Sequence, residues 1–198
     1  MINQVCIRWV STAPAFSYWC CFLVSALRLD WDQSQIVSGS IDGKVALWIV
    51  HVKRLSWTRP PLGTGPDLIF AVHEYPIVSV DVSNVLGVFV SLDQKGFLTL
   101  YSVRSKCVVR QWRIADSDAQ SLVPITLSLC KAARILVSAV DENTGTSFLI
   151  MYNLNGSLLE KKALEENDSV RCITSTFTGE YIATAGDAAV VAFWSPLE

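Results

Sequence analysis

Residues able to carry catalysis or metal binding are few in this sequence, and they are not spaced for either role. The 198 residues include two histidines, His51 and His73, and neither has an acidic or cysteine partner at the spacing of a zinc ligand set. The six cysteines form no Cys-x-x-Cys pair and no recurring disulfide frame. Cysteine is a common small core residue, so packing in a reducing compartment is favoured over redox or metal chemistry.

Motifs that bind phosphates or cations are also incomplete. Gly63-Thr64-Gly65 begins like a dinucleotide fingerprint, but Leu68 replaces the third glycine and Pro66 stands where a helix would begin. Two aspartate pairs lack the glycine and closing glutamate of an EF-hand: Asp30 with Asp32, and Asp116 with Asp118. No Gly-x-Ser-x-Gly elbow and no P-loop is present. The sequence therefore predicts no enzyme activity, no cofactor, no metal and no direct small-molecule substrate.

The composition indicates a folded chain with ample material for a core. Hydrophobic residues make up 51% of the sequence and charged residues 17%, which excludes a disordered polymer. The 16 basic and 18 acidic residues leave a net charge of -2, so we expect no nucleic-acid partner. The apolar runs are short and do not approach the roughly 20 residues that span a bilayer.

A repeated pattern organises the chain: a hydroxyl residue stands ten positions before an aromatic residue. Three copies have this spacing, namely Ser38 with Trp48, Ser91 with Tyr101, and Thr184 with Trp194. In a fourth copy Ser138 and Tyr152 are fourteen apart, and we interpret the segment DENTG as lengthening the turn by four. The closing aromatics are separated by 53, 51 and 42 residues. Repeats of about 40 to 50 residues are typical of propeller blades.

Each unit contains the short strands that a blade needs, judged by β-branched and aromatic enrichment. The predicted first strands are Val24 to Asp30, Ile77 to Ser83, Ile125 to Cys130 and Val170 to Phe177, and the clearest fourth strands are Cys107 to Ile114 and Ser157 to Leu164. Helix is the alternative at Leu158 to Asn167 only, where strong helix formers gather.

The predicted fold is all-β: a partial WD40-type β-propeller of about four four-stranded antiparallel blades, the last one incomplete. The expected blades are about 24–60, 72–114, 124–164 and 168–198, and residues 1–23 stay unassigned, with part of a preceding blade as one interpretation. Four blades are fewer than a common closed ring of seven, so we expect a fragment, a short isoform or an unstable arc. An open arc leaves apolar faces uncovered, and the purified chain should then aggregate or unfold without cooperativity.

The units resemble WD repeats, in which a hydroxyl, a turn aspartate, a tryptophan and a preceding histidine form a buried hydrogen-bonded set. The first unit matches three of these positions, with Ser38, Asp42 and Trp48. The second adds His73 but has Lys95 at the aspartate position, and the last has Ala188 there. The resemblance implies a structural role for these side chains.

A closer resemblance is to the WD-repeat region of the neurobeachin family of BEACH-domain scaffold proteins. It covers roughly Leu29 to Trp194, and its most specific segment is YNLNGSLL followed by ENDS. The resemblance implies a cytoplasmic scaffold, peripheral to endomembranes, that acts in vesicle traffic and receptor sorting. Its partners would be other proteins, including further blades or upstream domains of a longer chain. A substrate receptor of a ubiquitin ligase or a coat-like structural subunit is the alternative.

Tryptophan and arginine residues mark the candidate partner-binding positions, because these types are enriched in interface hot spots. A long Pro/Gly-rich connection from Val52 to Tyr75 holds three of them, and a predicted outer strand holds the fourth: Arg54, Trp57, Arg59 and Trp112. The alternative for Trp57 is packing beneath its own loop.

Overall fold

The computed structural model describes residues 23–30, 35–49, 66–114, 121–130, 132–164, 169–176 and 180–195. Within these ranges the chain forms fifteen β-strands in four antiparallel sheets, and none of the described residues is helical. No described segment is a helix long and apolar enough to cross a bilayer.

Each sheet is built from strands in chain order, and we name the sheets A to D. Sheet A contains β1 (Val24–Asp30), β2 (Gln35–Ser40), β3 (Lys44–Ile49) and β4 (Leu68–Ala71). Sheet B contains β5 (Ile77–Ser83), β6 (Val88–Asp93), β7 (Phe97–Ser102) and β8 (Cys107–Arg113). Sheet C contains β9 (Leu122–Cys130), β10 (Arg134–Asp141), β11 (Ser147–Asn153) and β12 (Leu158–Ala163). Sheet D contains β13 (Val170–Ser175), β14 (Ile182–Gly186) and β15 (Val191–Trp194).

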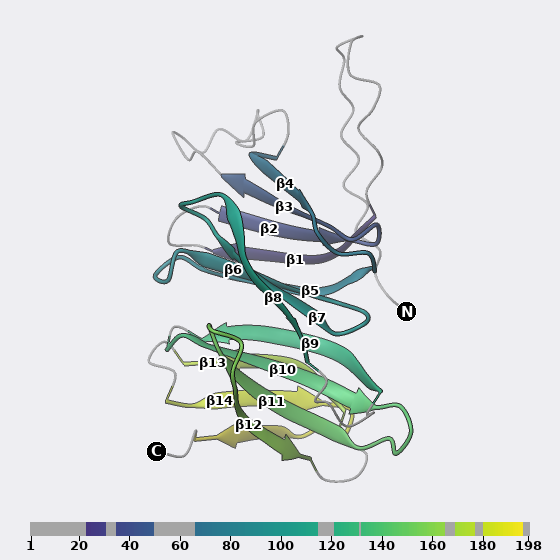
Figure 1. The fold of residues 1–198 in the computed structure, drawn as a ribbon. Coiled ribbons are helices and arrows are strands. Elements are labelled where there is room, and N and C mark those ends of the chain that lie inside the picture. Colours follow the sequence, from purple (N-terminus) through teal and green to yellow (C-terminus); the bar gives the residue numbers. More distant parts are fainter. Residues whose placement is uncertain are drawn as a thin grey trace, which may run out of the picture.

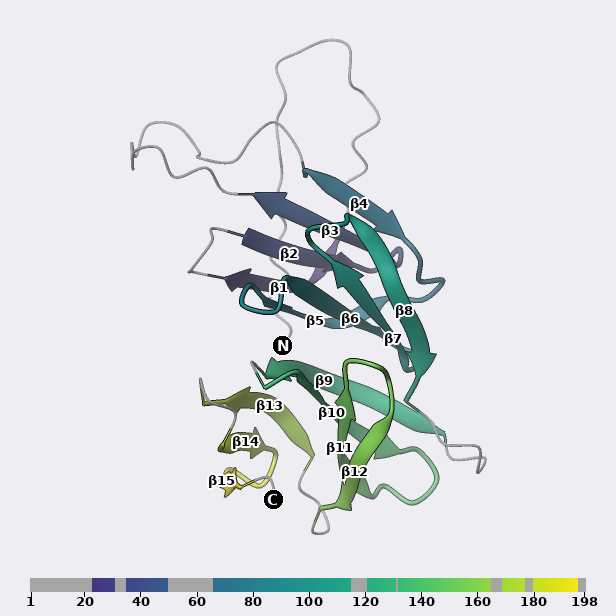
Figure 2. The ribbon, with the colours of Figure 1, turned by 60° about the vertical axis from the view of Figure 1, so that its left-hand side comes forward.

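The four sheets pack face to face in chain order, as Figures 1 and 2 show. The first strands of neighbouring sheets contact one another, β1 with β5, β5 with β9 and β9 with β13. A sheet whose first strand lies innermost and whose last strand lies outermost is a propeller blade. The all-β prediction is therefore confirmed, and the sheets are arranged as the four blades of a β-propeller.

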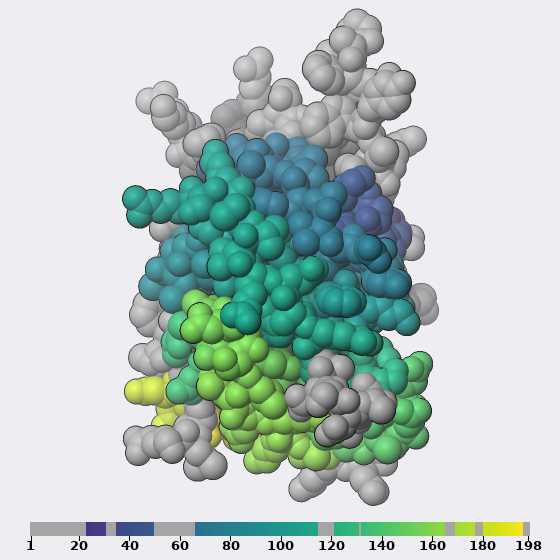
Figure 3. All heavy atoms as spheres, viewed as in Figure 1, coloured from purple at the N-terminus to yellow at the C-terminus, as the bar shows by residue number. Residues whose placement is uncertain are grey.

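Three apolar clusters hold these blades together, one at each junction between successive sheets. At the junction of sheets A and B, the Phe89 and Tyr101 rings stack at 4.4 Å, and Phe70 packs against both. Figure 3 shows the side chains of sheets B and C meeting as one continuous surface. None of the three clusters joins sheet D to sheet A, so the described blades form an arc with two uncovered faces.

The strand boundaries follow the sequence closely. The segment beginning at Leu158 is a strand, β12, as predicted, because it pairs with β11 and this pairing overrides its helix propensity. The last strand of sheet A is Leu68–Ala71, so the boundary expected near residue 60 was placed too early. Phe70 on this strand packs against the apolar cluster between sheets A and B, and the local sequence pattern does not reveal this contact.

The turn between β2 and β3 depends on glycine. Gly43 has a φ of +78°, in the left-handed region where side chains are strained. A Cβ on Gly43 would also collide with the backbone carbonyl of His73. Gly43 therefore satisfies both the hairpin geometry and the close approach of the connection to sheet B.

Candidate functional site

Three of the four predicted hydroxyl–aromatic pairs are joined by a hydrogen bond. Trp48 Nε1 donates to Ser38 Oγ at 3.0 Å, and Trp194 Nε1 donates to Thr184 Oγ1 at 2.8 Å. Ser91 Oγ and Tyr101 OH lie 3.0 Å apart. In each blade the hydroxyl is on the second strand and the aromatic on the third, so the bond fixes the ring within its own sheet.

The second blade extends this pair into a buried network of four side chains. His73 Nε2 lies 2.7 Å from Ser91 Oγ, and His73 Nδ1 lies 2.9 Å from Asp93 Oδ2. The other oxygen of Asp93 accepts hydrogen bonds from the backbone N–H groups of Lys95 and Phe97, each at 2.9 Å. The network connects the loop that precedes sheet B to its second and third strands.

The order Ser91–His73–Asp93 repeats the contacts of a hydrolase triad, but all three side chains are buried. The side chains of His73 and Asp93 are 0% and 1% exposed, and Ser91 is fully buried. A nucleophile needs access to a substrate carbonyl, and Ser91 Oγ is instead within hydrogen-bond distance of Tyr101 OH. Burial also raises the pKa of Tyr101 to about 12, against the lowering effect of its hydrogen bond to Ser91. In this arrangement the network stabilises the blade.

The aspartate of this network was not identified from the sequence. We expected it four residues after the hydroxyl, at Asp42, Lys95 and Ala188, whereas Asp93 stands two residues after Ser91. Asp42 is at the tip of its turn, where its carboxylate contacts Ser40 Oγ and accepts a hydrogen bond from Lys44 Nζ at 2.7 Å. Slight burial raises the pKa of Asp42, but the bonds to Lys44 and Ser40 outweigh it and lower the pKa overall. A signal was available, since an aspartate directly closing strand β6 is positioned to meet His73.

The third blade departs from the expected pairing because Ser138 and Tyr152 lie on opposite faces of sheet C. Tyr152 is opposite Ile135, so the residue equivalent to Ser91 is Val137. Tyr152 OH donates to the Ile114 carbonyl at 2.9 Å, and Ser138 Oγ donates to the Val170 carbonyl of sheet D at 3.0 Å. The hairpin is five residues longer than in the other blades rather than four, as the five letters of DENTG indicate. A one-residue error in a strand reverses the face of every side chain.

Polar side chains on the innermost strands bind neighbouring blades to each other. Ser79 Oγ accepts from the Leu127 N–H at 3.2 Å, and Asp81 Oδ2 accepts from the Leu129 N–H at 2.7 Å. Asp81 also lies 3.7 Å from Arg28 of sheet A. Burial raises the pKa of Asp81, and the hydrogen bond from Leu129 and the charge of Arg28 only partly oppose that rise.

The candidate partner-binding residues are placed unevenly. Arg54, Trp57 and Arg59 lie outside the described residues. Trp112 is half-buried on β8, with its ring 6.2 Å from the Tyr152 ring and against Gly156. These contacts between sheets B and C give the Trp112 ring a packing role. Partner binding by Trp112 stays a prediction.

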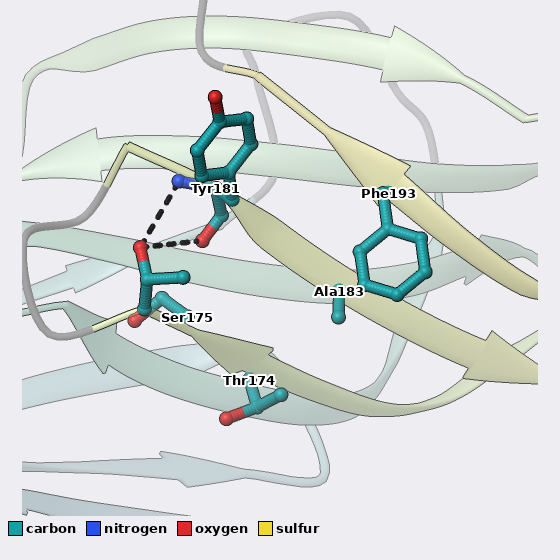
Figure 4. A pocket seen from close by; sticks show the side chains of 6 residues that line it. Thr174, Ser175, Tyr181, Ala183 and Phe193 are labelled. Atoms are coloured by element: carbon teal, nitrogen blue, oxygen red, sulfur yellow. Dashed lines mark hydrogen bonds between the residues drawn. The ribbon is translucent and has the colours of Figure 1, made fainter.

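Two other surfaces carry the exposed apolar side chains that an interaction site needs. The free face of sheet D has a shallow hollow lined by Thr174, Tyr181, Ala183 and Phe193 (Figure 4). The free face of sheet A exposes Leu27, Leu29 and Ile69. Among the described residues no group of three or more potential metal ligands occurs.

Comparison with known proteins gives a distant similarity along most of the chain. No protein-family model matches the chain. The chain is 23% identical over 177 residues to the BEACH domain-containing protein B of Arabidopsis thaliana. This match covers 83% of the chain and 6% of the much longer plant protein. A propeller fold and a distant similarity to a BEACH protein are together compatible with a protein-interaction scaffold.

Proposed function

We propose that this chain is a non-catalytic protein-interaction scaffold, the WD-type propeller part of a BEACH-type protein that acts in vesicle trafficking and membrane-receptor sorting. The observation that carries the proposal is the combination of four propeller blades with similarity to a BEACH protein along most of the chain. Propellers present loops and edges from rigid sheets, so they bind partners without a catalytic centre. The proposed location is the cytoplasm, with peripheral association to endomembranes.

The residues that resemble catalytic or metal-binding groups support this proposal through their placement. His73, Ser91 and Asp93 are buried within one blade, where a substrate has no access. Exposed apolar side chains instead gather on the outer sheet faces, which suits contacts between proteins.

Removing the coding segment from cells tests the proposal. We expect a set of membrane receptors to change in abundance at the cell surface while their total amounts stay constant, with recovery when the wild-type segment is restored. An unchanged surface proteome would contradict a role in receptor sorting. A rise in the total amounts of a few proteins would instead support the ubiquitin-ligase alternative, if proteasome inhibition in unmodified cells raises the same proteins.

A further inference from the structure

The outer strand of sheet B, β8, presents both its side chains and one backbone edge to the surroundings. Every residue of β8 except Trp112 is exposed, and Val109 is 55% exposed. β8 is the last strand of its sheet, so among the described residues no strand pairs with its outer edge (Figure 2). A strand edge with unpaired backbone groups is a template for pairing with another chain.

The register identifies which backbone groups of β8 are free. The Ile114 N–H donates to the Gly96 carbonyl at 2.9 Å, and in an antiparallel ladder every second residue bonds to the same neighbouring strand. Trp112, two residues before Ile114, therefore also directs its N–H and C=O toward β7. Gln111 and Arg113 direct theirs away from β7, toward the open edge.

The charge on this edge is basic and has no acidic counterpart. β8 contains Arg110 and Arg113 and no acidic residue, and the turn before it adds Arg104 and Lys106. All four side chains are exposed. None of them belongs to the ion pairs found among the described residues. This edge therefore has charge available for an acidic partner.

The other outer strands of the described blades lack this combination. β4 contains no charged residue, and β12 contains Glu160 beside its two lysines. Lys161 lies 4.7 Å from the centre of the Phe148 ring. Lys162 lies 4.5 Å from the centre of the Trp194 ring. Among β4, β8 and β12, only β8 carries cations without a carboxylate.

The two arginines of β8 lie on opposite faces of the strand, because they are three residues apart and side chains alternate. Arg113 lies 5.8 Å from the centre of the Phe97 ring. Arg110 shares its face with Trp112, whose ring packs toward Tyr152 of sheet C. A strand added at the edge would meet a cation on each face, and consecutive carboxylates on an extended peptide alternate between the same two faces.

We propose that the outer edge of β8 binds an extended acidic segment of a partner protein, which pairs with Gln111 and Arg113 as an added strand of sheet B. The open backbone edge favours a peptide over anionic lipid or nucleic acid, because neither supplies the alternating N–H and C=O groups of a strand. Sheet B lies between sheets A and C, so further blades at either end would pack on sheet A or sheet D rather than on β8. The proposal rests on the interaction role proposed above and is independent of receptor sorting.

Binding of a short threonine-rich peptide with a central run of glutamates, to the 198-residue chain immobilised at low density, tests the proposal. We expect saturable binding that weakens as salt screens the exposed charges. Arg110→Gln and Arg113→Gln should each weaken binding by about two- to fivefold, the effect of losing one exposed ion pair. Lys162→Gln is the matched control, since it removes an exposed cation from another outer strand, and it should leave binding unchanged.

Methylation of the peptide backbone separates strand pairing from charge attraction. Only every second residue of an added strand bonds to β8, so N-methylation of one alternate set should weaken binding by about tenfold or more. N-methylation of the other set should leave the affinity unchanged. Hydrogen exchange at the Gln111 and Arg113 amides should slow when the unmodified peptide binds.

Equal affinities for the two methylated peptides would overturn the proposal, because charge alone would then account for binding. Absence of peptide binding would also overturn it, leaving the cations as a guard against edge pairing and the surface-proteome experiment unaffected. So would tighter, Arg110-dependent binding to phosphatidylserine vesicles or to a single-stranded polynucleotide. Circular dichroism shows whether each variant keeps its strands, and Arg104→Gln replaces any that does not.

Discussion

Replacement of Asp93 by alanine tests whether one buried carboxylate holds the second blade together. Asp93 accepts hydrogen bonds from Lys95 N, Phe97 N and His73 Nδ1, each at 2.9 Å, and is 1% exposed. Asp93→Ala leaves three donors without an acceptor, and each buried unsatisfied group costs about 1–3 kcal/mol. Because these bonds share one carboxylate and are not additive, we expect a total loss of about 3–6 kcal/mol.

Urea unfolding at a fixed protein concentration measures this loss, and two further variants sharpen it. Asp42→Ala is the matched control, because Asp42 and its partner Lys44 are 40% and 36% exposed, and exposed ion pairs contribute about 0–1 kcal/mol. Asp93→Asn should lose less than Asp93→Ala, since the amide oxygen still accepts from Lys95 N and Phe97 N and the amide donates to His73. Equal losses for Asp93→Ala and Asp42→Ala would refute the reasoning.

Three other predictions follow from single positions. Gly43→Ala should destabilise the chain by more than Gly87→Ala in thermal unfolding, because both glycines have positive φ but only Gly43 meets a backbone carbonyl. Tyr101 should ionise near pH 12, and the difference in phenolate absorbance between wild type and Tyr101→Phe measures this. The contribution of the Tyr101 hydroxyl to stability should be complete below about pH 10 and lost toward pH 12. Ionisation of Tyr101 near pH 10 would contradict burial of its hydroxyl. Since burial raises the pKa of Asp81, its favourable contribution is present below about pH 4 and is lost as the pH rises through the folded-state value. The free energy of unfolding of wild type relative to Asp81→Asn should therefore fall as the pH rises above about 4, and a rise would contradict the assignment.

The positions of most strands can be predicted from the local sequence pattern. Val24–Asp30 and Ile77–Ser83 match their predicted bounds, because β-branched enrichment and flanking turn residues are local signals. Strand β4 was missed because its assignment depends on Phe70 packing between Phe89 and Tyr101, which are distant in sequence. The sequence predicts uncovered apolar faces at the two ends of an open arc, but it does not predict which residues form them.

The order of the chain by itself determined that four similar β-units follow one another, because alternation and spacing are properties of sequence alone. The spacing also predicted three of the hydroxyl–aromatic pairs, whereas only the tertiary structure decided the contacts of the third blade and of Asp93. Ser138 stands one residue beyond the position equivalent to Ser91, and that single step turns it from Tyr152 toward sheet D. The sequence pattern placed the aspartate partner of His73 at position 95, where Lys95 stands. Asp93 takes this role instead, because the register of the β6–β7 hairpin brings its carboxylate to His73. Side chains alternate between the two faces of a strand, so contacts depend on pairing register, and register is settled only when the sheets pack.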